Sequence, residues 1–135
     1  MESSELIGFS VRIGYRQPLT GTVSGIVLYA WQPEATRRRW ESLFRPALGR
    51  DQLELFRDRA DRVRKAGFER QASRFVTGVT DISAPILRDS IAAAALTVPF
   101  LETTSVVKSI KDSIELVMRC ARSISSALLS NDQRV

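Results

Sequence analysis

The chain has 135 residues with a hydrophobic fraction of 44%, enough for one compact core and too short for two ordinary domains. Lys and Arg outnumber Asp and Glu by 20 to 15, which gives a net charge of +5, and histidine is absent. The lack of histidine excludes imidazole acid–base catalysis, and the single cysteine, Cys120, excludes a disulfide within the chain. The same counts argue against a zinc site and against a thiol–imidazole pair, so we expect no metal and no cofactor.

The first residues and the charge pattern bear on location and partners. Residues 1–6 are polar and acidic, unlike a signal peptide, and no apolar run approaches the roughly 20 residues needed to cross a bilayer. We therefore expect a cytoplasmic protein with no membrane partner. The excess of basic residues allows direct nucleic-acid binding. Most of this excess comes from two predicted helices where Arg alternates with Asp and Glu, a pattern that is typical of a solvated face. Arg37, Arg38 and Arg39 would point about 100° apart on a helix, which makes a poor binding stripe.

The first half of the chain predicts one strand and three helices. Apolar residues take every second place over 7–13, which predicts a half-buried strand. A loop over 18–22 leads to a short buried helix over 23–31, with Thr22 as its N-cap and Pro33 closing it. Pro33 also suits the first turn of a second helix that runs to about Phe44. A third helix is predicted over 51–66, with Gly67 as its C-terminal cap.

The second half predicts a hairpin and a long helix. Residues 68–78 suggest a polar loop with a strand-like start, and 79–87 and 91–98 suggest two strands joined by the connection 88–90. An amphipathic helix is expected over 104–129, with Cys120 as a small core residue on its apolar side. Its predicted buried stripe is Val107, Ile110, Ile114, Val117, Ala121, Ile124 and Leu128. This order of elements predicts an α+β fold, with helices packed on one face of an antiparallel sheet.

The hairpin has two unlike faces if residue 87 lies opposite 91, because side chains alternate across a strand. The apolar face, expected to meet the helices, carries Ile82, Ala84, Ile86, Ala92, Ala94, Leu96 and Val98. The other face carries Val79, Asp81, Ser83, Pro85, Ala93, Ala95, Thr97 and Pro99. This second face has mostly small residues and no Lys, Arg or Glu, and it places Asp81 opposite Thr97. Such a space suits a ligand pocket, although a thinly covered face of an ordinary sheet explains the pattern equally well.

Three blocks of sequence together resemble a known family. The first runs from Gly14 to Gly25, with Pro18-Leu19 and Ser24-Gly25 ahead of an apolar helix and Pro33. The second holds Gly67-Phe68, Gly78-Val79 and the run Ile-Ser-Ala-Pro-Ile over 82–86, and the third is Ala-Ala-Leu-Thr-Val over 94–98. In order and spacing they resemble the effector-binding domain of IclR-family bacterial transcription regulators.

The resemblance implies a GAF-like sheet with a ligand pocket on the face away from the packed helices. Full members pair an N-terminal winged helix-turn-helix with this effector domain, and they form dimers and often tetramers. Residues 1–135 would then be a single, N-terminally truncated effector-binding domain with no winged helix-turn-helix. The implied function is to sense a small organic metabolite and to oligomerise as a homodimer or homotetramer. The domain would thereby control DNA binding by a domain outside this sequence.

The resemblance also implies ligand-binding positions, which are Val23, Ser24, Gln71, Asp81, Thr97 and Pro99. The first two would offer backbone N–H groups at a helix N-terminus, a physical anion site. The others depart from the family pattern, because Gln71 stands at an acidic position, Asp81 at a cysteine, and Thr97 and Pro99 at serines. We therefore expect the pocket to persist with a different ligand, one that carries a hydrogen-bond donor for Asp81.

Two other functions remain open on the sequence. A ligand-free oligomerisation module would have a collapsed face around Asp81 and Thr97. An enzyme could use Asp81 as a general base, but no second catalytic group with a stated role accompanies it. Asp81 could also be purely structural, paired with an arginine such as Arg74.

Overall fold

The computed structural model describes residues 13–14, 16–74, 76–102 and 109–132, so the predicted strand over 7–13 lies, except for Ile13, outside the described residues. A short 3₁₀ turn, η1 (Leu19–Gly21), precedes the first helix. The elements that follow are α1 (Val23–Ala30), α2 (Glu34–Phe44), α3 (Arg50–Ala66), β1 (Glu69–Ala72), β2 (Val79–Arg88), β3 (Ile91–Leu101) and α4 (Ile110–Asp132). All four predicted helices and both hairpin strands are present.

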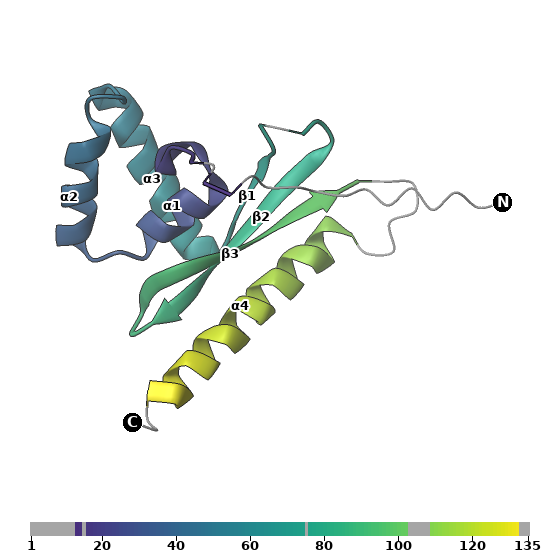
Figure 1. Ribbon diagram of the computed structural model, residues 1–135. Coiled ribbons are helices and arrows are strands. Elements are labelled where there is room, and N and C mark those ends of the chain that lie inside the picture. Colours follow the sequence, from purple (N-terminus) through teal and green to yellow (C-terminus); the bar gives the residue numbers. More distant parts are fainter. Residues whose placement is uncertain (1–12, 15, 75, 103–108, 133–135) are drawn as a thin grey trace.

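The three strands form one antiparallel sheet in the order β1-β2-β3, which confirms the predicted α+β class. On one face, Ile114, Val117 and Ala121 of α4 pack against Ile82 and Ala84 of β2. On the other face, a second apolar cluster joins α1 and α3 and reaches Ala95 of β3. The helices therefore cover both faces of the sheet rather than one, with α2 outermost (Figure 1).

The start of α1 is fixed by a cap and by one close approach of the backbone. Thr22 is the N-cap, as predicted, and its Oγ1 accepts the N–H of Gly25 at 3.0 Å. A Cβ at Gly25 would lie 1.8 Å from the carbonyl oxygen of Leu19 in η1. Only glycine lets η1 and α1 pack this closely.

The hairpin register differs from the predicted one by two residues. The turn is shorter than predicted, because Arg88 pairs with Ile91 and only Asp89 and Ser90, both at positive φ, connect the strands. A β-bulge near Ile86 then leaves one extra residue on β3. Each feature shifts the pairing by one position, which makes two in all. Because side chains alternate along a strand, every side chain between the bulge and the sheet end away from the turn keeps its predicted face. The partners change nonetheless, and the predicted pairing of Asp81 with Thr97 is wrong.

Predictions for β1 and for α4 also need comment. Residues 69–72, at the strand-like start of the predicted polar loop, form the strand β1 and pair with β2 along its edge. In α4, a reciprocal cap between Ser109 and Asp112 opens the helix at Ile110. Cys120 is exposed rather than in the core. The predicted stripe is buried at Ile114, Val117 and Ala121 but exposed at Ile124 and Leu128, while Val107 lies outside the described residues.

Candidate functional site

The structure brings the four predicted strand positions onto one face of the sheet. Gln71, Asp81 and Pro99 form a row across the three strands, and the next row pairs Ser83 with Thr97. Cross-strand partners, and residues two apart on a strand, point to the same side. All of these side chains therefore lie opposite the face that packs on α4 and on the face that meets α1. We call this surface the α1 face.

Asp81 is half-buried on the α1 face. Burial raises the pKa of its carboxyl above the ordinary value, and a hydrogen bond with Ser73 opposes that rise. Among the residues that the structure describes, none forms an ion pair with Asp81. The guanidinium of Arg74, the expected structural partner, instead lies near Gly21. Asp81 is thus a carboxylate in a place that favours its neutral form.

The neighbours of Asp81 are partly engaged with one another. The hydroxyl oxygens of Ser83 and Thr97 are 2.9 Å apart, with Ser83 fully buried and Thr97 exposed. The carbonyl oxygen of Gln71 accepts from Arg59 at 3.0 Å, which leaves its amide NH₂ as the group it can offer a ligand. The α1 face therefore offers an acid, a hydroxyl and an amide within two adjacent rows.

The first turn of α1 supplies the remaining predicted positions. Val23 opens the helix and is buried, whereas Ser24 is half-buried and directs its hydroxyl to Thr22 at 3.3 Å. The Thr22 side chain and carbonyl take the N–H groups of Gly25 and Ile26. The N–H groups of Val23 and Ser24 precede the first intrahelical bond and can meet an anion.

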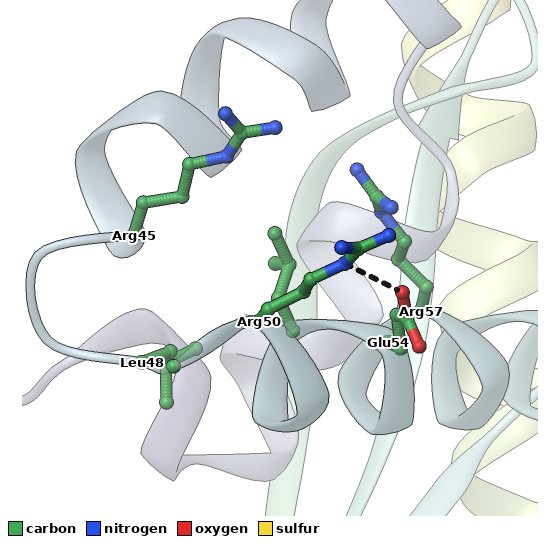
Figure 2. Close-up of a pocket in the computed structure, with 7 residues that line it drawn as sticks. Arg45, Leu48, Arg50, Glu54 and Arg57 are labelled. Carbon is green, nitrogen blue, oxygen red and sulfur yellow. Dashed lines mark ion pairs between the residues drawn. The ribbon is translucent and has the colours of Figure 1, made fainter.

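Several cavities lie away from these residues. Of five cavities lined by described residues, none includes any of the six predicted ligand positions. One of about 570 Å³ lies at the turn between α2 and α3 (Figure 2), and an adjacent one of about 580 Å³ reaches Tyr29. A third, of about 580 Å³, lies between the hairpin tip and α4.

The described residues hold no group of three or more acidic or thiol side chains placed to bind a metal ion. Within the same part of the chain, none of the helices combines the length and the apolar composition that a bilayer span requires.

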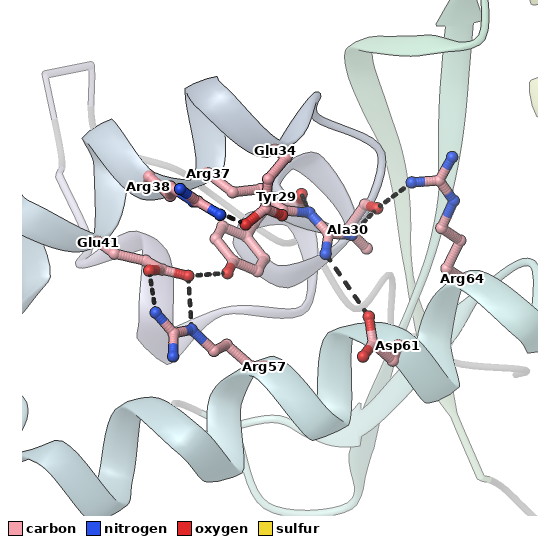
Figure 3. Close-up of polar contacts among 9 residues, drawn as sticks. All are labelled: Tyr29, Ala30, Glu34, Arg37, Arg38, Glu41, Arg57, Asp61 and Arg64. Carbon is pink, nitrogen blue, oxygen red and sulfur yellow. Dashed lines mark hydrogen bonds and ion pairs between the residues drawn. The ribbon is translucent and has the colours of Figure 1, made fainter.

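Sequence reasoning missed a buried ionic cluster between α1, α2 and α3 (Figure 3). Glu41 is only 4% exposed and accepts hydrogen bonds from Tyr29 and from both sides of the Arg57 guanidinium, one at 2.8 Å. The Arg57 hydrogen bonds hold the pKa of Glu41 below its ordinary value, against the effect of burial. Burial and the Glu41 carboxylate raise the pKa of Tyr29. Their spacing of twelve and sixteen residues gives no local pattern from which this contact could be inferred.

Arg37 belongs to the same region and is not on a solvated face. Its side chain is 13% exposed, and it donates to the carbonyl oxygens of Tyr29, at 3.2 Å, and of Ala30. Arg64 donates to Ala30 as well, at 3.3 Å. These cations satisfy the last carbonyls of α1, which ends without a glycine cap. The missing glycine was the one sequence signal that donors from elsewhere were needed.

Comparison with known proteins places the chain in a family. A family model described as "Bacterial transcriptional regulator IclR C-terminal" matches residues 1–126. None of the curated proteins compared with the chain matches it.

Solved structures share the fold. An IclR homolog from Microbacterium hydrocarbonoxydans, complexed with 4-hydroxybenzoate, has a TM-score of 0.68 at 23% identity, over 96% of this chain and 54% of its own. The C-terminal domain of a putative transcriptional regulator from Vibrio cholerae has a TM-score of 0.66 at 29% identity, over 90% of this chain and 73% of its own. The repressor BlcR of Agobacterium tumefaciens has a TM-score of 0.65 at 21% identity, over 87% of this chain and 50% of its own.

The chain thus spans about half of the first and third of these proteins. The family and its structural neighbours are transcriptional regulators, not enzymes, which removes the alternative of catalysis by Asp81. Because the family match covers nearly the whole chain, the chain belongs to the IclR family of bacterial transcriptional regulators and corresponds to their C-terminal domain.

Proposed function

We propose that this domain binds a small organic effector on the α1 face and so controls DNA binding by a separate winged helix-turn-helix domain of the whole regulator. The observation that carries the proposal is the shared face of Gln71, Asp81, Thr97 and Pro99, the face against which α1 packs. In this proposal the regulator acts in the cytoplasm as a homodimer or homotetramer, with no enzymatic step, metal or cofactor. DNA contacts belong to the other domain.

The chemistry of the α1 face favours an elongated ligand with two different ends. A carboxylate or carbonyl end would meet the N–H groups of Val23 and Ser24 at the start of α1. A hydroxyl, amide or amine end would donate to Asp81. A compact simple acid would bring its carboxylate close to the carboxylate of Asp81. The repulsion between these two negative charges would weaken its binding. 4-Hydroxybenzoate, the ligand of the Microbacterium hydrocarbonoxydans homolog, carries a carboxylate and a hydroxyl at opposite ends.

Thermal shift with a panel of aromatic and aliphatic hydroxy acids, including 4-hydroxybenzoate, followed by calorimetry, tests the proposal. Asp81→Ala should weaken binding of a panel member by about 1–3 kcal/mol, because a half-buried hydrogen-bond partner is lost. Asp58→Ala removes an exposed carboxylate of α3 and should leave the affinity unchanged. Equal affinity in both variants, with the fold intact, would show that Asp81 has no role in the pocket.

The second candidate is a ligand-free oligomerisation module. It is favoured by the complete burial of Ser83, by its contact with Thr97, and by the five cavities, none of which Asp81 lines. Such a module would self-associate yet show no thermal shift with any member of the panel. The same titrations therefore separate the two candidates.

A further inference from the structure

We propose that the cavity between the end of α2 and the start of α3 is an anion site, distinct from the α1 face, for a compact dianion such as a phosphate or a short dicarboxylate. The cavity has a volume of about 570 Å³. Its lining is Arg45, Leu48, Gly49, Arg50, Leu53, Glu54 and Arg57 (Figure 2). We call it the turn cavity.

Helical spacing and a rigid turn bring the lining together. Arg50, Leu53, Glu54 and Arg57 recur at the intervals of three and four residues that define one helix face. Arg45 follows the last residue of α2 and reaches toward that face across the turn (Figure 2). The Phe44 carbonyl accepts both the Ala47 and the Leu48 N–H at 2.9 Å, which closes the turn. The guanidinium groups therefore come from two elements whose connection is short and hydrogen-bonded.

The charges of the turn cavity do not cancel. Arg57 donates two hydrogen bonds to Glu41. Arg50, in contrast, lies 3.5 Å from Glu54, and its side chain is 90% exposed. Exposed pairs of this kind hold weakly. Arg45 forms no ion pair with any described residue. An anion between Arg45 and Arg50 would therefore gain two cations that have no strong competing partner.

The adjacent cavity near Tyr29 provides the contrast. It shares Arg45 and Arg57 with the turn cavity, but its other arginines have closer partners. Arg37 is largely buried and donates to the carbonyl oxygens of Tyr29 and Ala30, and Arg38 pairs with Glu34 at 2.9 Å. Among the arginines of the two cavities, Arg45 and Arg50 at the α2–α3 turn thus have the weakest contacts with other residues.

The geometry favours a small dianion. Two guanidinium forks can each hold a carboxylate or a phosphate edge by paired hydrogen bonds. Leu48 and Leu53 supply apolar surface for a short hydrocarbon part between two charged ends. The N-cap of α3 is Gly49, which offers no capping side chain, so the first N–H groups of that helix add to the positive potential of the arginines.

Two-dimensional amide NMR of the whole 135-residue chain, titrated in low salt with inorganic phosphate, succinate and acetate, tests the proposal. Phosphate and succinate should give saturable shifts confined to the amides near Arg45 and over 49–53, and acetate should bind more weakly. The double variant R45Q/R50Q should weaken binding by about tenfold or more, as expected for the loss of charge-assisted hydrogen bonds. R62Q removes an exposed arginine of α3 that does not line the turn cavity, and it should bind as the original chain does.

Three results would overturn the proposal. They are an absence of saturable shifts, equal shifts in R45Q/R50Q and R62Q as expected for general screening, and binding of a DNA duplex at this turn without binding of phosphate or succinate. Because the shifts are read at the α2–α3 turn, failure here leaves the proposed effector site on the α1 face untouched.

Discussion

Asp81 combines a position on the α1 face with an electrostatic cost to the folded state. Its folded pKa is raised chiefly by desolvation, so the folded protein favours the protonated carboxyl more than the unfolded chain does. A group of this kind adds stability below its unfolded pKa and loses that contribution as the pH rises through the folded pKa. At neutral pH the charged carboxylate therefore opposes folding, a cost that is common at residues that bind ligands.

The variant D81N should then be more stable than the original chain at pH 7. Asparagine keeps the shape and can still accept the Ser73 hydrogen bond, but it carries no charge to desolvate. The difference should vanish below about pH 4, where the original carboxyl is protonated in both states. Urea denaturation across that pH range checks this, with D58N as the exposed control. A D81N protein less stable than the original at pH 7 would indicate a structural role for the charge.

The contribution of Glu41 to stability depends on pH in the opposite direction to that of Asp81. Its lowered pKa means that its contribution is present above the unfolded pKa and is lost as the pH falls through the folded pKa. Glu41→Gln should cost about 2–4 kcal/mol of unfolding free energy at pH 7, because Arg57 loses its buried partner. The lower end is expected, since the Arg57 side chain is 42% exposed.

The matched control lies on the same helix. Glu34→Gln breaks the exposed pair with Arg38 and removes a carboxylate from the first turn of α2, and it should cost less than about 1 kcal/mol. Chemical denaturation at pH 7 and pH 4 measures both variants, and the Glu41→Gln deficit should shrink in acid. Equal losses in the two variants would mean that the cluster around Glu41 contributes no more than a surface pair.

At the scale of elements, Gly25 determines how η1 and α1 meet. Gly25→Ala would force a Cβ against the Leu19 carbonyl at 1.8 Å, so the first turn of α1 must move. We expect a loss of at least about 2 kcal/mol, in the range of overpacked sites, together with weaker effector binding. In the control Gly21→Ala, the nearest atom to the new Cβ is the flexible Arg74 guanidinium at 3.6 Å, and little should change. Thermal denaturation of the two variants compares them, and a well-folded Gly25→Ala protein would refute the steric argument.

The elements differ in how far the sequence could predict them. Helix ends followed from local chemistry, since Thr22 and Gly67 cap α1 and α3 as predicted. The hairpin register did not, because the two-residue turn and the bulge near Ile86 each shift it by one, and neither has a strong local signature. Beyond the bulge each side chain kept its predicted face, because the two shifts together move the register by two residues.

The candidate site was predictable only in part, for a related reason. The faces of Gln71 and Asp81 depend on alternation along single strands, which a sequence records. The ionic cluster around Glu41 depends on how separate helices dock, which no local pattern encodes. The same holds for Cys120, which lies at the margin of the apolar stripe of α4 and turns away from the side that Val117 and Ala121 pack against the sheet.

At the scale of the whole molecule, α4 leaves apolar surface uncovered beyond the sheet. Ile124, Leu128 and Leu129 are 37–47% exposed near its C-terminal end. We expect the domain to self-associate through this part of α4, with a total buried area above about 1,000 Å². Leu128→Glu should shift the protein toward monomer in analytical ultracentrifugation, whereas Leu55→Glu, at an exposed position of α3, should not. A monomeric original chain at high concentration would contradict the expectation.

The proposed function depends on an effector bound between α1 and the sheet. Amide NMR with the hydroxy acid that gives the largest thermal shift, starting with 4-hydroxybenzoate, tests for such binding. Saturable shifts should concentrate at Val23, Ser24, Gln71, Asp81 and Thr97, and the α4 face of the sheet should be spared. Saturable shifts confined to α4 or to the hairpin tip, with the α1 face unchanged, would contradict the proposed function.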